Sequence, residues 1–141
     1  MNTNMKLYKF LVAVLCIATI SCAVTATAKE KKAKKMYLFG IATSFNDSTA
    51  YFTPIQEIDS VTTAGKTSIL SNKQEYSLQL KNYFQNQGDI HRTCVTFNNA
   101  SKSKLEKTYQ QLKQKYQKKF NMTVKNIENT DFQYQRVVIV Q

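Results

Sequence analysis

A near-continuous apolar run from residue 36 to residue 45 places the tightest constraint on how this chain folds. The run reads Met-Tyr-Leu-Phe-Gly-Ile-Ala-Thr-Ser-Phe and contains no charged residue. A strand that covers only one face of a sheet alternates apolar and polar residues, whereas an unbroken apolar strand indicates burial on both faces. We therefore expect a strand that is buried on both faces. Gly40, in its middle, indicates a bulge or a close approach of another part of the chain.

Other segments of the chain also have the composition of strands. The turn residues Asn46-Asp47-Ser48 precede a returning strand at 50–53, which Pro54 ends. Residues 54–70 are ambiguous, with a further short strand at 68–70. Three later strands are predicted, at 93–97, 122–127 and 132–140. The last ends in Val-Val-Ile-Val, which on an exposed edge would promote aggregation, so we expect it to be paired inside the sheet.

Two segments are predicted to be helices. In residues 71–87, Ser71 and Gln74 form a capping box, and Gly88 suits the position of positive φ after the helix. Residues 100–120 carry apolar side chains at spacings of three and four, and Asn121 ends the helix. Ser103 and Glu106 form a second capping box, and Asn99 or Ser101 is the alternative cap. The apolar stripe consists of Leu105, Tyr109, Leu112, Tyr116 and Phe120.

The order of these elements predicts an α+β fold. We expect a mostly antiparallel sheet of four to five strands, with two helices packed on one face. The domain boundaries are predicted as a signal peptide at 1–28, a lysine-rich flexible arm at 29–35 and a single α+β domain at 36–141. The arm is expected to be flexible because a run of like charges repels itself.

The N-terminal residues have the pattern of an export signal. Lys6 and Lys9 precede an apolar stretch at 10–20, and Ala26-Thr27-Ala28 is a cleavage site for signal peptidase. The protein is therefore expected to be exported, and to be periplasmic or secreted. Two alternatives would anchor it to a membrane. One is lipidation at Cys22, and the other is an uncleaved leader, since the lysines that follow it resist translocation.

The charge of the chain is concentrated in two places. The sequence has 20 basic and 9 acidic residues, a net charge of +11. Most of this excess lies in the arm and in residues 101–120, which contain seven lysines and one glutamate. Nucleic acid is not expected as a partner, because the chain is exported. The predicted binding residues form a basic face for an envelope polymer or a protein, namely Lys102, Lys113, Lys115, Lys118 and Lys119.

Residues with catalytic or metal-binding chemistry are few. Cys94 and His91 are three residues apart and are the candidates for a thiolate–imidazole pair, although alternate residues of a strand point to opposite faces. The more ordinary interpretation is a buried, inert thiol. Glu57 and Asp59 have a spacing found in some glycosidases, but also in solvated surface acids. No metal, cofactor or catalytic residue is expected.

Two stretches carry a resemblance to known proteins. The segment Tyr37 to Ser48, together with Arg92-Thr93-Cys94-Val95 and the lysine-rich helix, resembles small exported proteins of gut Bacteroidetes that have no assigned activity. A strand followed by Asn98-Asn99-Ala100-Ser101 and a long helix is similar to the second half of the peptidoglycan-binding SPOR domain. The first resemblance implies an envelope location, and the second implies binding to the cell wall.

These observations together favour a non-enzymatic, exported binding domain of the bacterial envelope. A SPOR-like module that binds peptidoglycan is one alternative. A thiol-dependent enzyme that uses Cys94 and His91 is another.

The leader generates the first prediction. The exported protein should begin at Lys29, because signal peptidase cleaves after the A-x-A motif. Intact mass spectrometry of the exported protein checks this directly. A lipid-modified N-terminus at Cys22, or a chain that retains residues 1–28, would contradict it.

Overall fold

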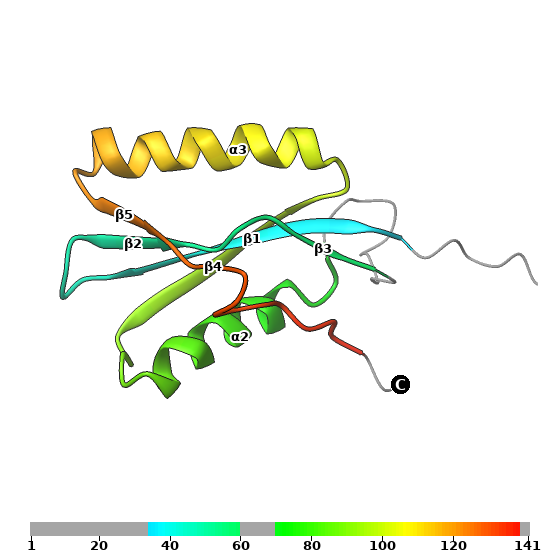
Figure 1. Ribbon diagram of the computed structural model, residues 1–141, viewed down its shortest axis with the longest axis horizontal. Coiled ribbons are helices and arrows are strands. Elements are labelled where there is room, and N and C mark those ends of the chain that lie inside the picture. The colour runs from blue at the N-terminus through cyan, green and yellow to red at the C-terminus, as the bar shows by residue number, and fades with distance from the viewer. Residues whose placement is uncertain (1–33, 60–69, 139–141) are drawn as a thin grey trace, which may run out of the picture. The chain divides into compact units, whose positions relative to one another are not determined.

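The computed structural model describes residues 34–59 and 70–138 (Figure 1). The predicted leader, Cys22 and most of the lysine-rich arm lie outside the described residues. The elements are β1 (Met36–Ser44), β2 (Thr49–Phe52), β3 (Gln56–Ile58), α2 (Lys73–Asn86), β4 (Arg92–Asn99), α3 (Lys102–Gln114), the π-helical turn η1 (Lys115–Lys119) and β5 (Thr123–Asn126).

Strand β1 lies in the middle of one five-stranded sheet. On one side it pairs with β4 from Tyr37 to Ser44, and on the other side it pairs first with β3 and then with β2. Pro54 separates β2 from β3, while Thr53 still exchanges hydrogen bonds with Gly40 at the break. Strand β5 pairs with β2 in parallel, and the other pairings are antiparallel. The expected α+β fold with a mostly antiparallel sheet is confirmed.

The side chains of β1 alternate between two separate apolar clusters. Met36, Leu38 and Ala42 belong to a cluster that includes Tyr76 and Leu80 of α2. Phe39 and Ile41 belong to a second cluster, with Phe52 of β2 and Leu105 of α3. All five of these β1 side chains are at most 1% exposed. The prediction that this strand is buried on both faces is therefore confirmed.

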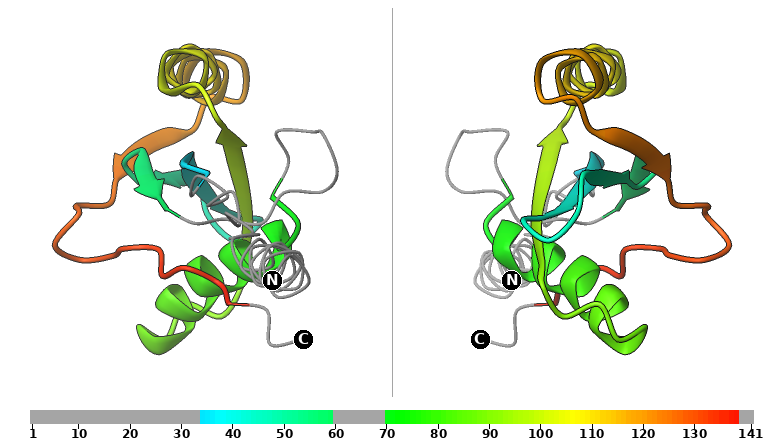
Figure 2. Two further views of the ribbon diagram at one scale, coloured as in Figure 1. Left: turned by 90° about the vertical axis from the view of Figure 1, so that its right-hand side faces the viewer. Right: turned by 90° about the vertical axis from the view of Figure 1, so that its left-hand side faces the viewer.

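The two helices cover opposite faces of the sheet, so the expectation that both pack on one face was wrong. Figures 1 and 2 show the sheet between α3 on one side and α2 on the other. The physical reason lies in β1 itself. An apolar strand with alternate residues on two faces needs a cover on each, and the sequence supplies one amphipathic helix per face.

The C-terminal segment also differs from the expectation, because residues 132–138 form no strand. Instead, the side-chain amides of two glutamines take the place of a neighbouring strand. Gln56 donates to the carbonyl of Phe132 (3.1 Å) and accepts from the amide of Tyr134 (2.8 Å). Gln79 binds both backbone groups of Gln135 in the same way, at 2.8 Å. Residues 139–141 lie outside the described residues.

The helix ends follow the prediction only in part. Helix α2 begins with Asn72 rather than Ser71 in the cap position. Helix α3 begins after Ser101, which was one of the alternative caps, and not at the box of Ser103 and Glu106. The predicted ends are confirmed. Gly88 has φ of 84° and Asn121 has φ of 51°, the left-handed conformation that stops a helix.

Gly40 marks a close approach, as one of the two sequence interpretations proposed. A Cβ atom at this position would lie 2.1 Å from the hydroxyl oxygen of Tyr134 and 2.6 Å from Cδ2 of Leu80. The Tyr134 hydroxyl is buried and makes no hydrogen bond within the described part of the chain. Burial raises its pKa, and the nearby hydroxyls of Thr96 and Thr53 offset this only in part. Glycine is thus required because the tyrosine ring stands against the strand.

This contact generates the second prediction. Gly40→Ala should lower the free energy of unfolding by about 1–3 kcal/mol, since the added methyl group overpacks a closed core. Tyr134→Phe should change the free energy of unfolding little, because the hydroxyl that it removes has no hydrogen-bond partner. In the double variant, this change also removes the oxygen atom that the methyl group added at position 40 would touch. In urea denaturation, the double variant should therefore be more stable than Gly40→Ala alone. If the effects of the two substitutions on the free energy of unfolding simply added, the close approach of Tyr134 to Gly40 would be contradicted.

Candidate functional site

The apolar stripe of the lysine-rich helix packs on the sheet, as predicted. Leu105 is buried, and Tyr109, Leu112 and Tyr116 are partly buried against the same cluster. The ring of Tyr109 makes edge contacts with Phe39 at 4.9 Å and Phe52 at 5.6 Å between centroids. These contacts fix the rotation of α3, and so fix which of its lysines face which part of the surface.

Phe120 departs from this stripe and is 48% exposed. The amide of Phe120 donates to the carbonyl of Lys115 at 3.1 Å, the five-residue hydrogen bond of a π-helical turn. Such a turn holds one residue more than an α-helical turn, so it displaces the next residues around the helix axis. The spacing of the apolar residues does not indicate this turn.

The five predicted binding lysines are divided between different parts of α3 and η1. Lys102 and Lys113 are eleven residues apart, so at about 100° per residue they lie on the same flank of the helix. This flank faces β2, because the Lys113 ammonium lies 4.7 Å from the centroid of Tyr109 and 5.9 Å from that of Phe52. Lys115, Lys118 and Lys119 belong to η1, at the C-terminal end of the helix.

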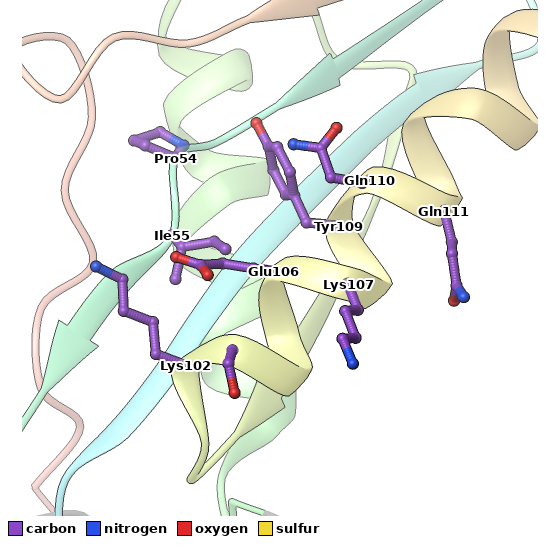
Figure 3. A pocket seen from close by; sticks show the side chains of 9 residues that line it. Pro54, Ile55, Lys102, Glu106, Lys107, Tyr109, Gln110 and Gln111 are labelled. Atoms are coloured by element: carbon purple, nitrogen blue, oxygen red, sulfur yellow. The ribbon is translucent and has the colours of Figure 1, made fainter.

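An open groove of about 880 Å³ runs between this flank and the break in the sheet (Figure 3). Pro54 and Ile55 form one wall, since the break after β2 carries them out of the ladder. Figure 3 shows Lys102 and Glu106 reaching over the groove, whereas Lys107 and Gln111 point away. The lining residues are Pro54, Ile55, Lys102, Ser103, Glu106, Lys107, Tyr109, Gln110 and Gln111.

The groove combines apolar surface with charged and amide groups. Pro54, Ile55 and the Tyr109 ring are its apolar part, while Lys102 and Glu106 are both exposed. A site of this kind binds by contact with a ligand's apolar faces and by orienting its charges. Of the residues that line the groove, sequence reasoning identified Lys102 as a binding residue but missed Pro54, Ile55 and Tyr109. Pro54 was the available signal, because proline is found at breaks of a ladder.

Cys94 and His91 are not held as a catalytic pair. His91 lies exposed in the turn before β4, whereas Cys94 is half-buried and packs against the cluster beneath α2. Burial raises the pKa of the Cys94 thiol to about 11. A thiol with this pKa is protonated at neutral pH and is a weak nucleophile.

Glu57 and Asp59 both face Lys35, the last residue of the predicted arm. The Lys35 ammonium lies 2.6 Å from Glu57 and 3.9 Å from Asp59. Hydrogen bonds from Lys35 and Tyr37 lower the pKa of Glu57. All of these groups are well exposed, so the ion pairs contribute little to stability. Their arrangement is that of solvated surface charges.

The described residues contain neither a cluster of metal ligands nor a helix that could span a membrane. Within residues 34–59 and 70–138, no three His, Cys, Asp or Glu side chains gather where they could hold a metal ion. In the same part of the chain, no helix has the length and hydropathy needed to cross a bilayer.

One charged cluster that sequence reasoning missed lies around Arg92, whose side chain is only 4% exposed. Its guanidinium donates to Asp47 and to Asp89, each at 2.5 Å, and to the carbonyl of Thr49 at 3.3 Å. The same group lies 4.5 Å from the ring centroid of Tyr51. Arg92 therefore ties the start of β4 to the β1–β2 turn. Asp89, three residues before it in the sequence, was the local signal.

Comparisons with protein-family models, with curated proteins and with solved structures find no match to this chain. A function must therefore be argued from the surface itself.

The Arg92 cluster generates the third prediction. Arg92→Met should lower the free energy of unfolding at neutral pH by about 2 kcal/mol, because it removes hydrogen bonds to charged groups. Arg136→Met, which removes the same charge from an exposed position, should be nearly neutral. Chemical denaturation of both variants measures the difference.

The effect of Arg92 should depend on pH in a defined direction. The amide of Thr49 and the guanidinium of Arg92 lower the pKa of Asp47 in the folded protein. The stabilisation that ionised Asp47 contributes is thus fully present above the pKa of about 3.9 that it has in the unfolded chain. This stabilisation is lost as the pH falls through the lower pKa that Asp47 has in the folded protein. The stability difference between wild type and Arg92→Met should shrink below about pH 4. A difference that stays constant as the pH is lowered to about 2 would contradict this ion pair.

Proposed function

We propose that this protein is an exported, non-enzymatic binding domain of the bacterial envelope, and that its groove holds an extended, carboxylate-bearing envelope polymer. One observation carries the proposal. Lys102 and Lys113 lie on the same flank of α3, about 16 Å apart along its axis. The groove begins at Lys102, and Tyr109 lies between the two lysines in the sequence of the helix. Two cations at this separation suit a ligand with repeated charges better than one small anion.

The rest of the groove supports a polymer with both apolar and polar groups. The apolar surface of Pro54, Ile55 and Tyr109 suits the faces of sugar rings, and the side chains of Ser103 and Gln110 offer hydrogen bonds. Peptidoglycan carries sugars, amides and carboxylates, so it is the envelope polymer we favour. The predicted leader and the envelope location implied by the resemblance also support this choice.

The thiol-dependent alternative has less support. The raised pKa of Cys94 works against a reactive thiolate, and His91 lies in an exposed turn. A protein partner for the groove is the remaining alternative, and a failure to bind peptidoglycan would favour it.

The fourth prediction concerns Lys102, which lines the groove, and Lys113, which lies on the same flank of α3. Lys102→Gln with Lys113→Gln should weaken co-sedimentation with purified peptidoglycan sacculi roughly tenfold, because two charge contacts of modest strength are lost. Lys81→Gln with Lys104→Gln is the matched control, since it removes the same charge from positions outside the groove lining. Neither Lys81, which lies on α2, nor Lys104 is among the residues that line the groove.

The control should bind as the wild type does. Equal losses in the two double variants would show that only net charge matters, which overturns the groove as the site. A wild-type protein that does not sediment with sacculi would overturn the polymer and favour a protein partner.

A further inference from the structure

A phenylalanine stands fully exposed at one end of the domain. Phe45 lies in the turn between β1 and β2, and its relative exposure is 101%. Its neighbours in the turn, Asn46, Asp47 and Ser48, are polar and exposed. An aromatic ring that contacts nothing in its own fold contributes nothing to stability, and such residues often mark an interaction surface.

A second exposed aromatic residue lies at the same end of the domain. Phe120 follows η1 and is 48% exposed. The chain then enters β5, where the amide of Thr123 donates to the carbonyl of Ser48, in the β1–β2 turn, at 2.8 Å. Figure 1 shows the β1–β2 turn, the C-terminal end of the long helix and the start of β5 together at this end.

Lysines lie beside Phe120 and near the β1–β2 turn. Lys115, Lys118 and Lys119 lie on η1, and the Lys115 ammonium is 5.5 Å from the centroid of Phe120. Lys125 of β5 is close enough to Asp47 to lower its pKa. The carboxylate of Asp47 is already bound by Arg92. The end of the domain that carries Phe45 and Phe120, called the tip below, thus has two exposed aromatic rings, with lysines beside Phe120 and near the turn that holds Phe45.

We propose that the tip docks on the surface of a bilayer that contains anionic phospholipids. Phe45 and Phe120 enter the boundary between headgroups and acyl chains, and Lys115, Lys118 and Lys119 bind the lipid phosphates. Exposed aromatic residues with a rim of lysines are what an anionic bilayer surface selects, because each ring gains apolar burial and each lysine gains electrostatic attraction. A second copy of the tip is disfavoured, because the two sets of lysines would repel each other.

This proposal goes beyond the groove and does not depend on it. The proposed polymer site uses the groove with Lys102 and, on the same flank of α3, Lys113, whereas the tip uses the π-helical turn and the β1–β2 turn. A protein that holds both surfaces would bring an envelope polymer close to a membrane.

Vesicle co-sedimentation tests the proposal, with the same N-terminus in every variant. The protein should bind mixed phosphatidylglycerol–phosphatidylcholine vesicles, and bind pure phosphatidylcholine weakly. Phe45→Ser should weaken binding to the anionic vesicles roughly tenfold. Changing Lys115, Lys118 and Lys119 together to Gln should weaken it roughly a hundredfold.

The matched control changes Lys81, Lys104 and Lys107 to Gln, which removes the same net charge away from the tip. Its binding should fall by less than about threefold. An equal loss in the two triple variants would overturn the proposal, because attraction would then depend on net charge alone. Equal binding to anionic vesicles by Phe45→Ser and wild type would also overturn it.

A fluorescence experiment reports the insertion itself, because the chain contains no tryptophan. In Phe45→Trp, emission should shift to the blue with anionic vesicles and be quenched by brominated lipids. Leu78→Trp, at an exposed position on α2, should show neither effect. An emission of the Phe45→Trp variant that stays unshifted in vesicle-bound protein would overturn the insertion. Light scattering that shows self-association through Phe45, with no vesicle binding, would replace the bilayer by a second copy.

Discussion

The burial of β1 on both faces is the constraint on which the rest of this structure depends. Its alternate side chains belong to two clusters that the strand itself separates. Each cluster needs its own cover, so one helix lies on each face and the chain must cross from one face to the other. Gly40 sits where the packing is closest, because Leu80 and Tyr134 both stand against the backbone of the strand.

This layered arrangement decides which surfaces remain for binding. Among the helices that the structure describes, only α3 covers its face of the sheet, and the edge contacts of Tyr109 with Phe39 and Phe52 set its rotation. One flank therefore lies over the break at Pro54 and forms the groove. The π-helical turn then directs Phe120 outward beside the β1–β2 turn. The two proposed surfaces thus arise from one helix and the strands beneath it.

The sequence predicted what depends on local pattern and missed what depends on distant contacts. The run at 36–45, the stripe on α3 and the helix ends at Gly88 and Asn121 were correct because each rests on spacing or on backbone conformation. The side of the sheet that each helix covers depends on both clusters at once, and was wrong. Residues 132–138 have strand-forming composition, but glutamine side chains bind backbone groups of Phe132, Tyr134 and Gln135 in place of a neighbouring strand.

The candidate site was predictable only in its charges. The lysines are visible in the sequence, but their division between the groove and the tip follows from the rotation of α3 and from the π-helical turn. Pro54 and Ile55 come from a segment whose structure the sequence left ambiguous. Arg92 carries a charge that is usually exposed, so its burial between Asp47 and Asp89 could not be read from composition.

Nuclear Overhauser contacts from two adjacent residues of β1 test the central claim most directly. With helices on opposite faces, the Hα atoms of Gly40 should show contacts to a methyl group of Leu80 in α2, and the ring of Phe39 should show contacts to the ring of Tyr109 in α3. No contacts are expected from the ring of Phe39 to Leu80, or from Gly40 to the ring of Tyr109. Contacts from the ring of Phe39 to Leu80, in place of those from Gly40, would contradict a sheet covered on both faces.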